Sequence, residues 1–229
     1  MLRKLYDATW GRLFAATYDW FLGATEKAGL HDMRRELLSE ASGRTLEIGA
    51  GTGLNHDLYP DAVTELVLTE PFEPMARRLR ERVAAQASAG GSASGAAGPA
   101  AVRPTEIVEA PGDALPFPDD SFDTVVVTLV LCTVPDPAAT LAEVARVLEP
   151  GGRMLFLEHV RADDESLARW QDRLHGPWYA FGHGCNCNRD TLAAIERSPL
   201  SVEHADPGEM PKAPPIVRPI LTGSARRAA

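Results

Sequence analysis

The order of apolar and polar positions divides the chain into a helical beginning and a longer region in which strands and helices alternate. Residues 1–40 repeat aromatic and aliphatic side chains at helical spacing and end in a charged amphipathic segment, which predicts helices and no strand. From residue 44 on, short apolar runs are typical of buried strands: TLEI, ELVLTE, TEIVEA, FDTVVVTLVL and RMLFLEHV. The alternation predicts a doubly wound, mostly parallel α/β sheet behind an N-terminal helical cap.

Turn and helix signals separate these strands. Pro74 suits the first turn of a helix that PMARRLRERVAAQ continues, and DPAATLAEVARVLEPGG has a capping acid, an early proline and a terminating glycine pair. LNHDLY, which follows the first strand's turn, can also begin a helix. Towards the C-terminus we expect a helix near residues 167–174, the short helix TLAAIER and a strand near residues 200–204.

Residues 87–101, ASAGGSASGAAGPAA, are low in complexity and contain no bulky apolar side chain. Such composition predicts a flexible loop. Strand patterns resume directly after it, and the two strands before it would make an inadequate sheet by themselves. We therefore expect a helical region over residues 1–43 and one domain over residues 44–229, with residues 87–101 as an insertion.

Composition and charge narrow the class of protein. The net charge of −9 and the pI near 5.2 give no electrostatic reason to bind a polyanion, so no nucleic-acid partner is expected. No export signal and no uncharged apolar run long enough to span a bilayer occur, which predicts a cytoplasmic protein without stable membrane insertion. Three cysteines suggest no disulfide framework, and the sequence leaves the oligomeric state open.

The turn after the first predicted strand reads EIGAGTG at residues 47–53, with glycine at every second position. The dinucleotide fingerprint is G-x-G-x-x-G, and Leu54 stands where its third glycine belongs. Glu47 directly precedes the turn, where its charge disfavours a pyrophosphate and favours a cationic ligand. S-adenosylmethionine (SAM) has a cationic sulfonium and no phosphate. It therefore fits this turn better than NAD, and an NAD-dependent oxidoreductase is the least favoured alternative.

Four segments carry a family resemblance: LEIGAGTG, LTEP, GDALPFPDDSFDTVVV and EVARVLEPGGRMLFLEH. In this order and spacing, over residues 44–160, they resemble class I SAM-dependent methyltransferases of the type 11 (ubiquinone/menaquinone methyltransferase-like) group. The resemblance implies a Rossmann-like sheet of seven strands with the last strand antiparallel, an N-terminal region that closes over the cofactor as a lid, and SAM as cofactor.

The same resemblance assigns roles to single positions. It implies that the glycine turn lies against the methionine part of SAM, that Glu70 binds the ribose hydroxyls, and that Asp113 with Ala114 holds the adenine. The full set of expected cofactor-binding residues is Tyr18, Glu47, Gly49, Ala50, Gly51, Gly53, Glu70, Pro71, Asp113, Ala114 and Leu129.

Three further segments, TLVLCTV, EHV and GCNCNR, resemble the alkyl thiol methyltransferases. Vertebrate members begin with a hydrophobic membrane anchor, which this sequence does not show, and residues 87–101 have no counterpart in them. The resemblance implies a small, partly hydrophobic acceptor such as a thiol. A quinone precursor or other phenol, an amine such as a phospholipid headgroup, and a SAM-binding protein without catalytic activity are the alternatives.

His159 and His183 are the candidate general bases, because histidine accepts a proton near neutral pH. His159 ends the fifth predicted strand, at the edge of the sheet where ligands bind. The HGCNCN segment brings His183 close to Cys185 and Cys187, but paired zinc ligands are usually spaced by two to four residues and come in fours. We therefore expect a loop on the acceptor side, no metal, and Cys132 as a small buried residue.

Overall fold

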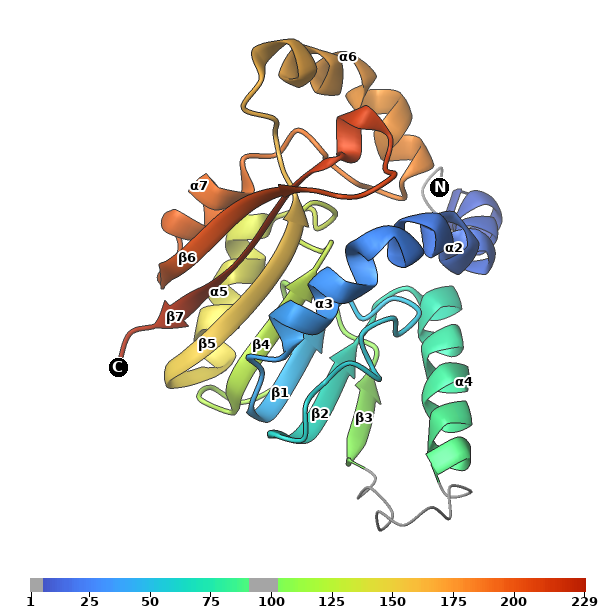
Figure 1. Ribbon diagram of the computed structural model, residues 1–229. Helices are drawn as coiled ribbons and strands as arrows, with labels where there is room; N and C mark the ends of the chain where they lie inside the picture. Colours follow the sequence, from blue (N-terminus) through green and yellow to red (C-terminus); the bar gives the residue numbers. More distant parts are fainter. Residues whose placement is uncertain (1–5, 91–102) are drawn as a thin grey trace.

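The computed structural model describes residues 6–90 and 103–229, which form one seven-stranded sheet with helices on both faces (Figure 1). Neighbouring strands follow the order β3-β2-β1-β4-β5-β7-β6, and β7 runs antiparallel to both of its neighbours. The predicted fold, including the antiparallel last strand, is confirmed. The strands are β1 (Gly43–Ile48), β2 (Val63–Thr69), β3 (Thr105–Val108), β4 (Phe122–Thr128), β5 (Leu148–His159), β6 (Leu200–Glu209) and β7 (Pro219–Arg227).

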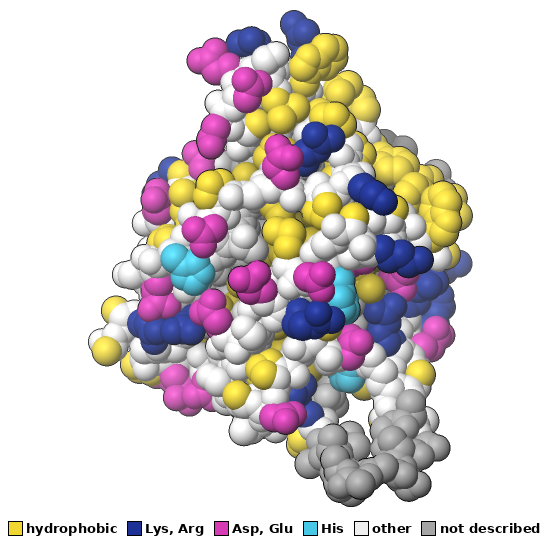
Figure 2. All heavy atoms as spheres, in the orientation of Figure 1, with side chains coloured by type: hydrophobic (Ala, Val, Ile, Leu, Met, Phe, Trp, Pro, Cys, Tyr) yellow, Lys and Arg dark blue, Asp and Glu magenta, His cyan; other side chains and the backbone are white. Residues whose placement is uncertain are grey.

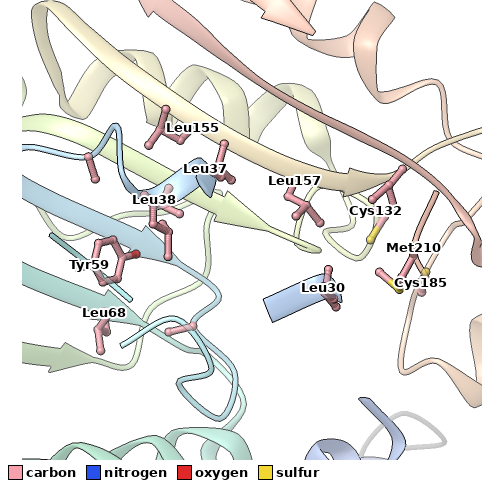
Figure 3. Packing of buried hydrophobic residues seen from close by; sticks show 14 of the residues in the cluster. Leu30, Leu37, Leu38, Tyr59, Leu68, Cys132, Leu155, Leu157, Cys185 and Met210 are labelled. Atoms are coloured by element: carbon pink, nitrogen blue, oxygen red, sulfur yellow. The ribbon is translucent and has the colours of Figure 1, made fainter. Parts of the chain in front are cut away.

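The central strands are apolar on both faces because each face has its own core. In β5, Leu155 and Leu157 belong to a cluster that also contains Leu38 of the N-terminal helices, as Figure 3 shows. Met154 and Phe156, which alternate with them, belong to the cluster on the opposite face. Successive side chains of a strand point to opposite faces, so an unbroken apolar run is what a sheet covered on both sides requires.

The N-terminal helices follow one another almost without interruption. A kink falls at Gly29, whose φ of 140° is open to glycine but not to other residues. Figure 1 shows α2 beyond the carboxyl ends of the strands, on the same side as α6. The described helices are η1 (Asp7–Gly11), α2 (Arg12–Thr25), η2 (Glu26–Leu30), α3 (His31–Leu38), α4 (Glu73–Gly90), α5 (Pro137–Val147), α6 (Glu165–Phe181), α7 (Thr191–Glu196) and η3 (Pro215–Val217). None of the helices in the described ranges is long and apolar enough to span a membrane.

Several elements differ from the sequence prediction, among them helix α6, which runs from Glu165 to Phe181, and strand β6, which runs on to Glu209. LNHDLY forms consecutive turns rather than a helix, because the side chains of Asn55 and Tyr59 both reach inward to the carboxylate of Glu47. Helix α4 continues to Gly90, so the first residues of the expected insertion are helical, and residues 91–102 lie outside the described part. Helix α5 ends at Val147. Residues 148–150, which were expected to be helical, form the beginning of strand β5.

Arg34 of α3 joins the N-terminal helices to the sheet. Its side chain is buried and donates from Nε to Glu26 Oε1 at 3.1 Å. Its Nη1 donates to Asn55 Oδ1 at 3.0 Å, in the turn after β1, and to Thr128 Oγ1 at 3.2 Å, at the end of β4. One buried guanidinium therefore connects three segments that are distant in the sequence.

We expect Arg34→Ala to lower the free energy of unfolding by about 3 kcal/mol, because it leaves the partly buried Glu26 without its cation. The neighbouring Arg35 is the matched control, since its side chain is 59% exposed and pairs with Asp32 at the surface. Arg35→Ala should change the free energy by less than about 0.5 kcal/mol. Urea unfolding followed by circular dichroism measures both, and equal losses would contradict this role of Arg34.

Candidate cofactor and acceptor site

A cavity of about 640 Å³ opens at the carboxyl ends of the parallel strands, between the sheet and helices α2 and α6. In open α/β sheets ligands bind at this edge, and the volume is typical of small-molecule sites. Of the expected cofactor-binding residues, seven line it: Tyr18, Gly49, Gly51, Glu70, Pro71, Asp113 and Leu129. Both candidate bases, His159 and His183, line the same cavity.

The glycine turn forms one wall of the cavity. Gly49 and Gly51 have φ values of +65° and +59°, which glycine adopts without strain. A Cβ on Gly49 would lie 2.8 Å from Val130 Cγ2, whereas a Cβ on Gly51 would meet no atom within 4 Å. The space over Gly51 is therefore open to a ligand. Gly53 packs instead against Leu79 of α4 and does not line the cavity.

Glu70, directly after β2, holds this turn. Its Oε2 accepts from the Gly51 backbone N–H at 2.9 Å and its Oε1 from the Phe72 N–H at 2.8 Å. Burial raises the pKa of the Glu70 carboxyl, and these two hydrogen bonds oppose the rise. Each carboxylate oxygen has a second lone pair, so Glu70 retains acceptors for the two hydroxyls of a ribose.

Glu47 lies beneath the turn rather than in the cavity. Its oxygens accept from Asn55 Nδ2 and from the Tyr59 hydroxyl, both at 2.8 Å. Burial raises the pKa of this carboxyl, and the two hydrogen bonds lower it. Glu47 and Ala50 border a separate hollow of about 20 Å³, which is enough for a single water molecule.

Asp113 and Leu129 also belong to the wall of the cavity. Asp113 is exposed and lines it, whereas Ala114 does not. Leu129 follows β4 with a φ of +60°, a conformation that is rare for leucine and clusters at functional sites. Its N–H donates to Leu157 O at 2.8 Å, so the strained turn is fixed to β5.

Helix α2 contacts the glycine turn through an interaction that the sequence patterns did not reveal. Asp19 accepts from Thr52 Oγ1 at 2.5 Å and from Arg82 Nη2 of α4 at 2.6 Å. The preceding Tyr18 lines the cavity, and burial raises its pKa to about 12. The phenol therefore stays protonated at neutral pH and can donate a hydrogen bond.

His183 lies among aromatic rings. Its imidazole stacks on Phe14 and Tyr6 with centroids 5.3 and 5.6 Å apart, and Phe72 approaches to 4.7 Å. Its Nε2 is 3.6 Å from Asp7 Oδ1. The ring joins the first helices to the loop after α6 and forms part of the cavity wall.

His159 meets two cysteines. Its Nδ1 lies 3.7 Å from Cys132 Sγ and 3.6 Å from Cys185 Sγ, and all three side chains are buried. Cys187 is buried but is not part of this group. Cys132 follows β4 and His159 is the last residue of the adjacent strand β5, so the sequence could have predicted that these two side chains lie close together. No sequence pattern brings Cys185 to them. The expected roles of His159 and His183 as bases stay predictions.

The residues of the cavity fit SAM. Gly51 leaves room for the methionine part, Glu70 presents acceptors for the ribose, and Ile48, Pro111 and Leu129 add apolar surface near them. Glu70 in the cavity wall and Glu47 beneath the turn are both buried carboxylates, which would favour a cationic ligand and repel a pyrophosphate.

Comparison with known proteins agrees with this geometry. Residues 46–156 match the family model described as a methyltransferase domain. Thiol S-methyltransferase TMT1B of Homo sapiens is 34% identical over 182 residues, which cover 75% of this chain and 69% of that protein. Phosphatidylethanolamine N-methyltransferase of Cereibacter sphaeroides is 29% identical over 198 residues, with 81% and 87% covered.

Solved structures show the same fold. A SAM-dependent methyltransferase from Thermotoga maritima has a TM-score of 0.65 at 17% identity, over 94% of this chain and 97% of that one. One from Mesorhizobium loti has a TM-score of 0.57 at 23% identity, over 86% and 96%. Given the glycine turn, the acid that follows β2 and these relatives, the chain belongs to the class I SAM-dependent methyltransferases of the type 11 group.

Proposed function

We propose that the chain transfers the methyl group of SAM to a small, partly hydrophobic thiol. The observation that carries this proposal is a cavity that has the glycine turn on one side and largely apolar walls on the other. The names of the relatives TMT1A and TMT1B of Homo sapiens, both thiol S-methyltransferases at 32% and 34% identity, support a thiol as acceptor.

Helices α2 and α6 supply the apolar side of the cavity. Phe14 and Phe21 extend from α2, and Trp178 and Phe181 extend from α6. Aromatic side chains also cover the outer surface of the two helices, where hydrophobic atoms gather at the top and right of Figure 2. The exposed large hydrophobic residues there are Leu13, Trp20, Phe21, Trp170, Leu174, Tyr179 and Phe181. The alkyl or aryl group of an acceptor would lose its hydration where it contacts these apolar side chains.

The reaction needs alignment and exclusion of water more than acid–base power. Bound SAM supplies a methyl group that its sulfonium already activates. The acceptor sulfur forms the new S–CH₃ bond while the sulfonium C–S bond breaks, and the electron pair of that bond stays on S-adenosylhomocysteine. The thiolate is the reactive form of the acceptor, so the site has to favour loss of the thiol proton.

The N-terminal helices act as a lid in this proposal. Residues 6–38 hold Tyr18 and Phe14 over the cavity, and Asp19 fastens them to the glycine turn and to α4. Opening of this contact would admit SAM, and closure would exclude water from the transfer.

Replacement of Gly51 by valine should weaken SAM binding at least about tenfold, because the side chain would occupy the open space of the cavity. Gly151→Val is the matched control: its φ is also positive, at +79°, and its Cβ would also meet nothing, but it does not line the cavity. Calorimetric titration with SAM measures both. Equal binding by the two variants would place the cofactor elsewhere.

Among short alkyl thiols, from ethanethiol to butanethiol, each added methylene should raise kcat/KM about fourfold, which corresponds to about 0.8 kcal/mol of burial in the apolar cavity. Mass spectrometry of products from thiols, phenols and amines incubated with protein and SAM tests this. Methylation of a phenol or amine in preference to every thiol contradicts the proposed acceptor. SAM binding without any turnover would indicate a non-catalytic protein.

Asp19→Asn should raise the dissociation constant of SAM about fivefold, the equivalent of about 1 kcal/mol, because it weakens the charged contact with Arg82 that fastens the lid. Asp32→Asn is the control, since Asp32 pairs with the exposed Arg35 at the surface and has no other ion pair among the described residues. Limited proteolysis with and without SAM should show faster cleavage of the N-terminal helices in Asp19→Asn alone. Unchanged affinity and cleavage would show that this contact does not govern closure.

A further inference from the structure

Three potential metal ligands from three distant segments meet in the cavity wall. Cys132 follows β4, His159 ends β5, and Cys185 lies in the loop after α6. Their Sγ and imidazole nitrogen atoms all lie within 4.8 Å of one another. Figure 3 shows Cys132 and Cys185 beside Met210 at one end of the core cluster. The three residues line the cavity in which the acceptor is proposed to bind.

The distances suit a tetrahedral metal ion. Zinc binds cysteine sulfur at about 2.3 Å and histidine nitrogen at about 2.0 Å, so a sulfur and a nitrogen ligand at the tetrahedral angle lie about 3.5 Å apart. The measured separations from His159 Nδ1 are 3.7 Å to Cys132 Sγ and 3.6 Å to Cys185 Sγ. A thiol hydrogen bond has a similar length, so distance alone does not decide between the two arrangements.

The polar atoms of His159 favour the metal. Its Nδ1 contacts only sulfur atoms in the hydrogen bonds of the described residues, and sulfur is a weak hydrogen-bonding partner. Its Nε2 is buried and has no hydrogen-bond partner in that part of the chain. Because sulfur satisfies Nδ1 only weakly, an ion held between Nδ1 and the two sulfur atoms would be a stronger partner for Nδ1, and Nε2 would then carry the N–H of the neutral ring.

The three side chains are held in place independently of any ion. Asn186, next to Cys185, donates to Cys132 O from its backbone N at 2.7 Å and from Nδ2 at 3.1 Å. The Cys132 N–H donates to Glu158 Oε2 at 3.1 Å, directly before His159. These bonds fix the loops that carry the ligands, so the chain can fold before the metal binds.

Charge also balances in this arrangement. Two cysteine thiolates and a neutral imidazole would neutralise a divalent cation, and Glu158 would remain the only buried charge next to the site among the residues described around it. A site with three protein ligands leaves a fourth position open, which is the arrangement of catalytic rather than structural zinc.

We propose that Cys132, His159 and Cys185 bind one Zn²⁺ ion, and that its open position takes the sulfur of the acceptor thiol. The second half rests on the proposed function. On binding, the thiol would displace a water molecule from the open position and lose its proton to solvent as a Zn–S bond forms, so that the nucleophile is held as thiolate. After methyl transfer the product is a neutral thioether, a weaker ligand, and it leaves while water returns to the metal.

This inference departs from the sequence prediction of no metal. That prediction rested on the spacing within HGCNCN, where Cys185 and Cys187 are too close together in the chain to form a usual ligand pair. The fold supplies the other two ligands from strand ends. His159 would then be a metal ligand rather than the base expected from its position.

The test uses the reduced full-length chain and the metal alone. After dialysis against Zn²⁺, elemental analysis should find one zinc per chain, and Co²⁺ should give the intense visible and thiolate charge-transfer bands of tetrahedral sulfur coordination. Cys185→Ser and His159→Gln should each weaken binding by at least about 100-fold, more than the loss of an outer partner would. Cys187→Ser, a buried cysteine of the same loop, should keep full stoichiometry.

Two results overturn the metal site: absence of zinc and of the tetrahedral cobalt spectrum in the wild-type chain, or equal zinc affinity in Cys185→Ser and Cys187→Ser. Circular dichroism of each variant shows whether it folds, and the wild-type spectrum decides the question if a variant does not. An oxidised chain with a Cys132–Cys185 disulfide that persists under reducing conditions would also overturn it.

The acceptor half has its own readout. Butanethiol added to the cobalt form should shift the charge-transfer bands, whereas butanol should not. Bound cobalt with no shift overturns the proposed role of the open position and leaves the metal site standing. A shift without methylated product overturns the proposed function alone. Full thiol methylation by zinc-free protein contradicts the role of the metal in the reaction.

Discussion

Buried carboxylates at the carboxyl edge of the sheet hold the loops that form the cavity. Glu47 lies near the end of β1, Glu70 follows β2, and Glu158 lies near the end of β5. A buried carboxylate is costly unless it is hydrogen-bonded, so each one must gather donors around it. Glu70 takes the N–H groups of Gly51 and Phe72.

Glu158 organises the next loop in the same way. It accepts the N–H groups of Val130, Leu131 and Cys132 at 2.8, 2.9 and 3.1 Å. Burial raises its pKa and these three bonds oppose the rise, so the carboxylate and the loop conformation support each other. The positive φ of Leu129, directly before this loop, is maintained by that constraint. Buried carboxylates therefore hold the glycine turn after β1 and the loop after the neighbouring strand β4 in the same way.

The sheet could be predicted from the sequence because its strands are buried on both faces, and runs such as TVVVT are typical of that environment. The glycine turn after β1 was predictable for a similar reason, since Gly49 and Gly51 occupy backbone conformations that favour glycine. Family resemblance added Glu70 and Pro71, which line the cavity. It also added Gly53, which packs against Leu79 and does not line the cavity.

The rest of the site depends on contacts between distant segments, which no local pattern encodes. Arg34 looks like any charged residue of an amphipathic helix, yet it is buried against the turn after β1. Asp19 bridges α2, the glycine turn and α4. Cys185 reaches Cys132 because Asn186 donates to the Cys132 carbonyl and Arg189 donates to the carbonyls of Leu131 and Val134. Sequence reasoning named the chemically capable side chains but could not place them together.

The most direct measurement is a crystal structure of the chain with S-adenosylhomocysteine and a short alkyl thiol. We expect the ribose hydroxyls on the Glu70 carboxylate, the sulfur of the cofactor product above Gly51, and the thiol sulfur between it and the group of Cys132, His159 and Cys185. A nucleoside bound away from the glycine turn, or a thiol outside the cavity of α2 and α6, would contradict the proposed reaction.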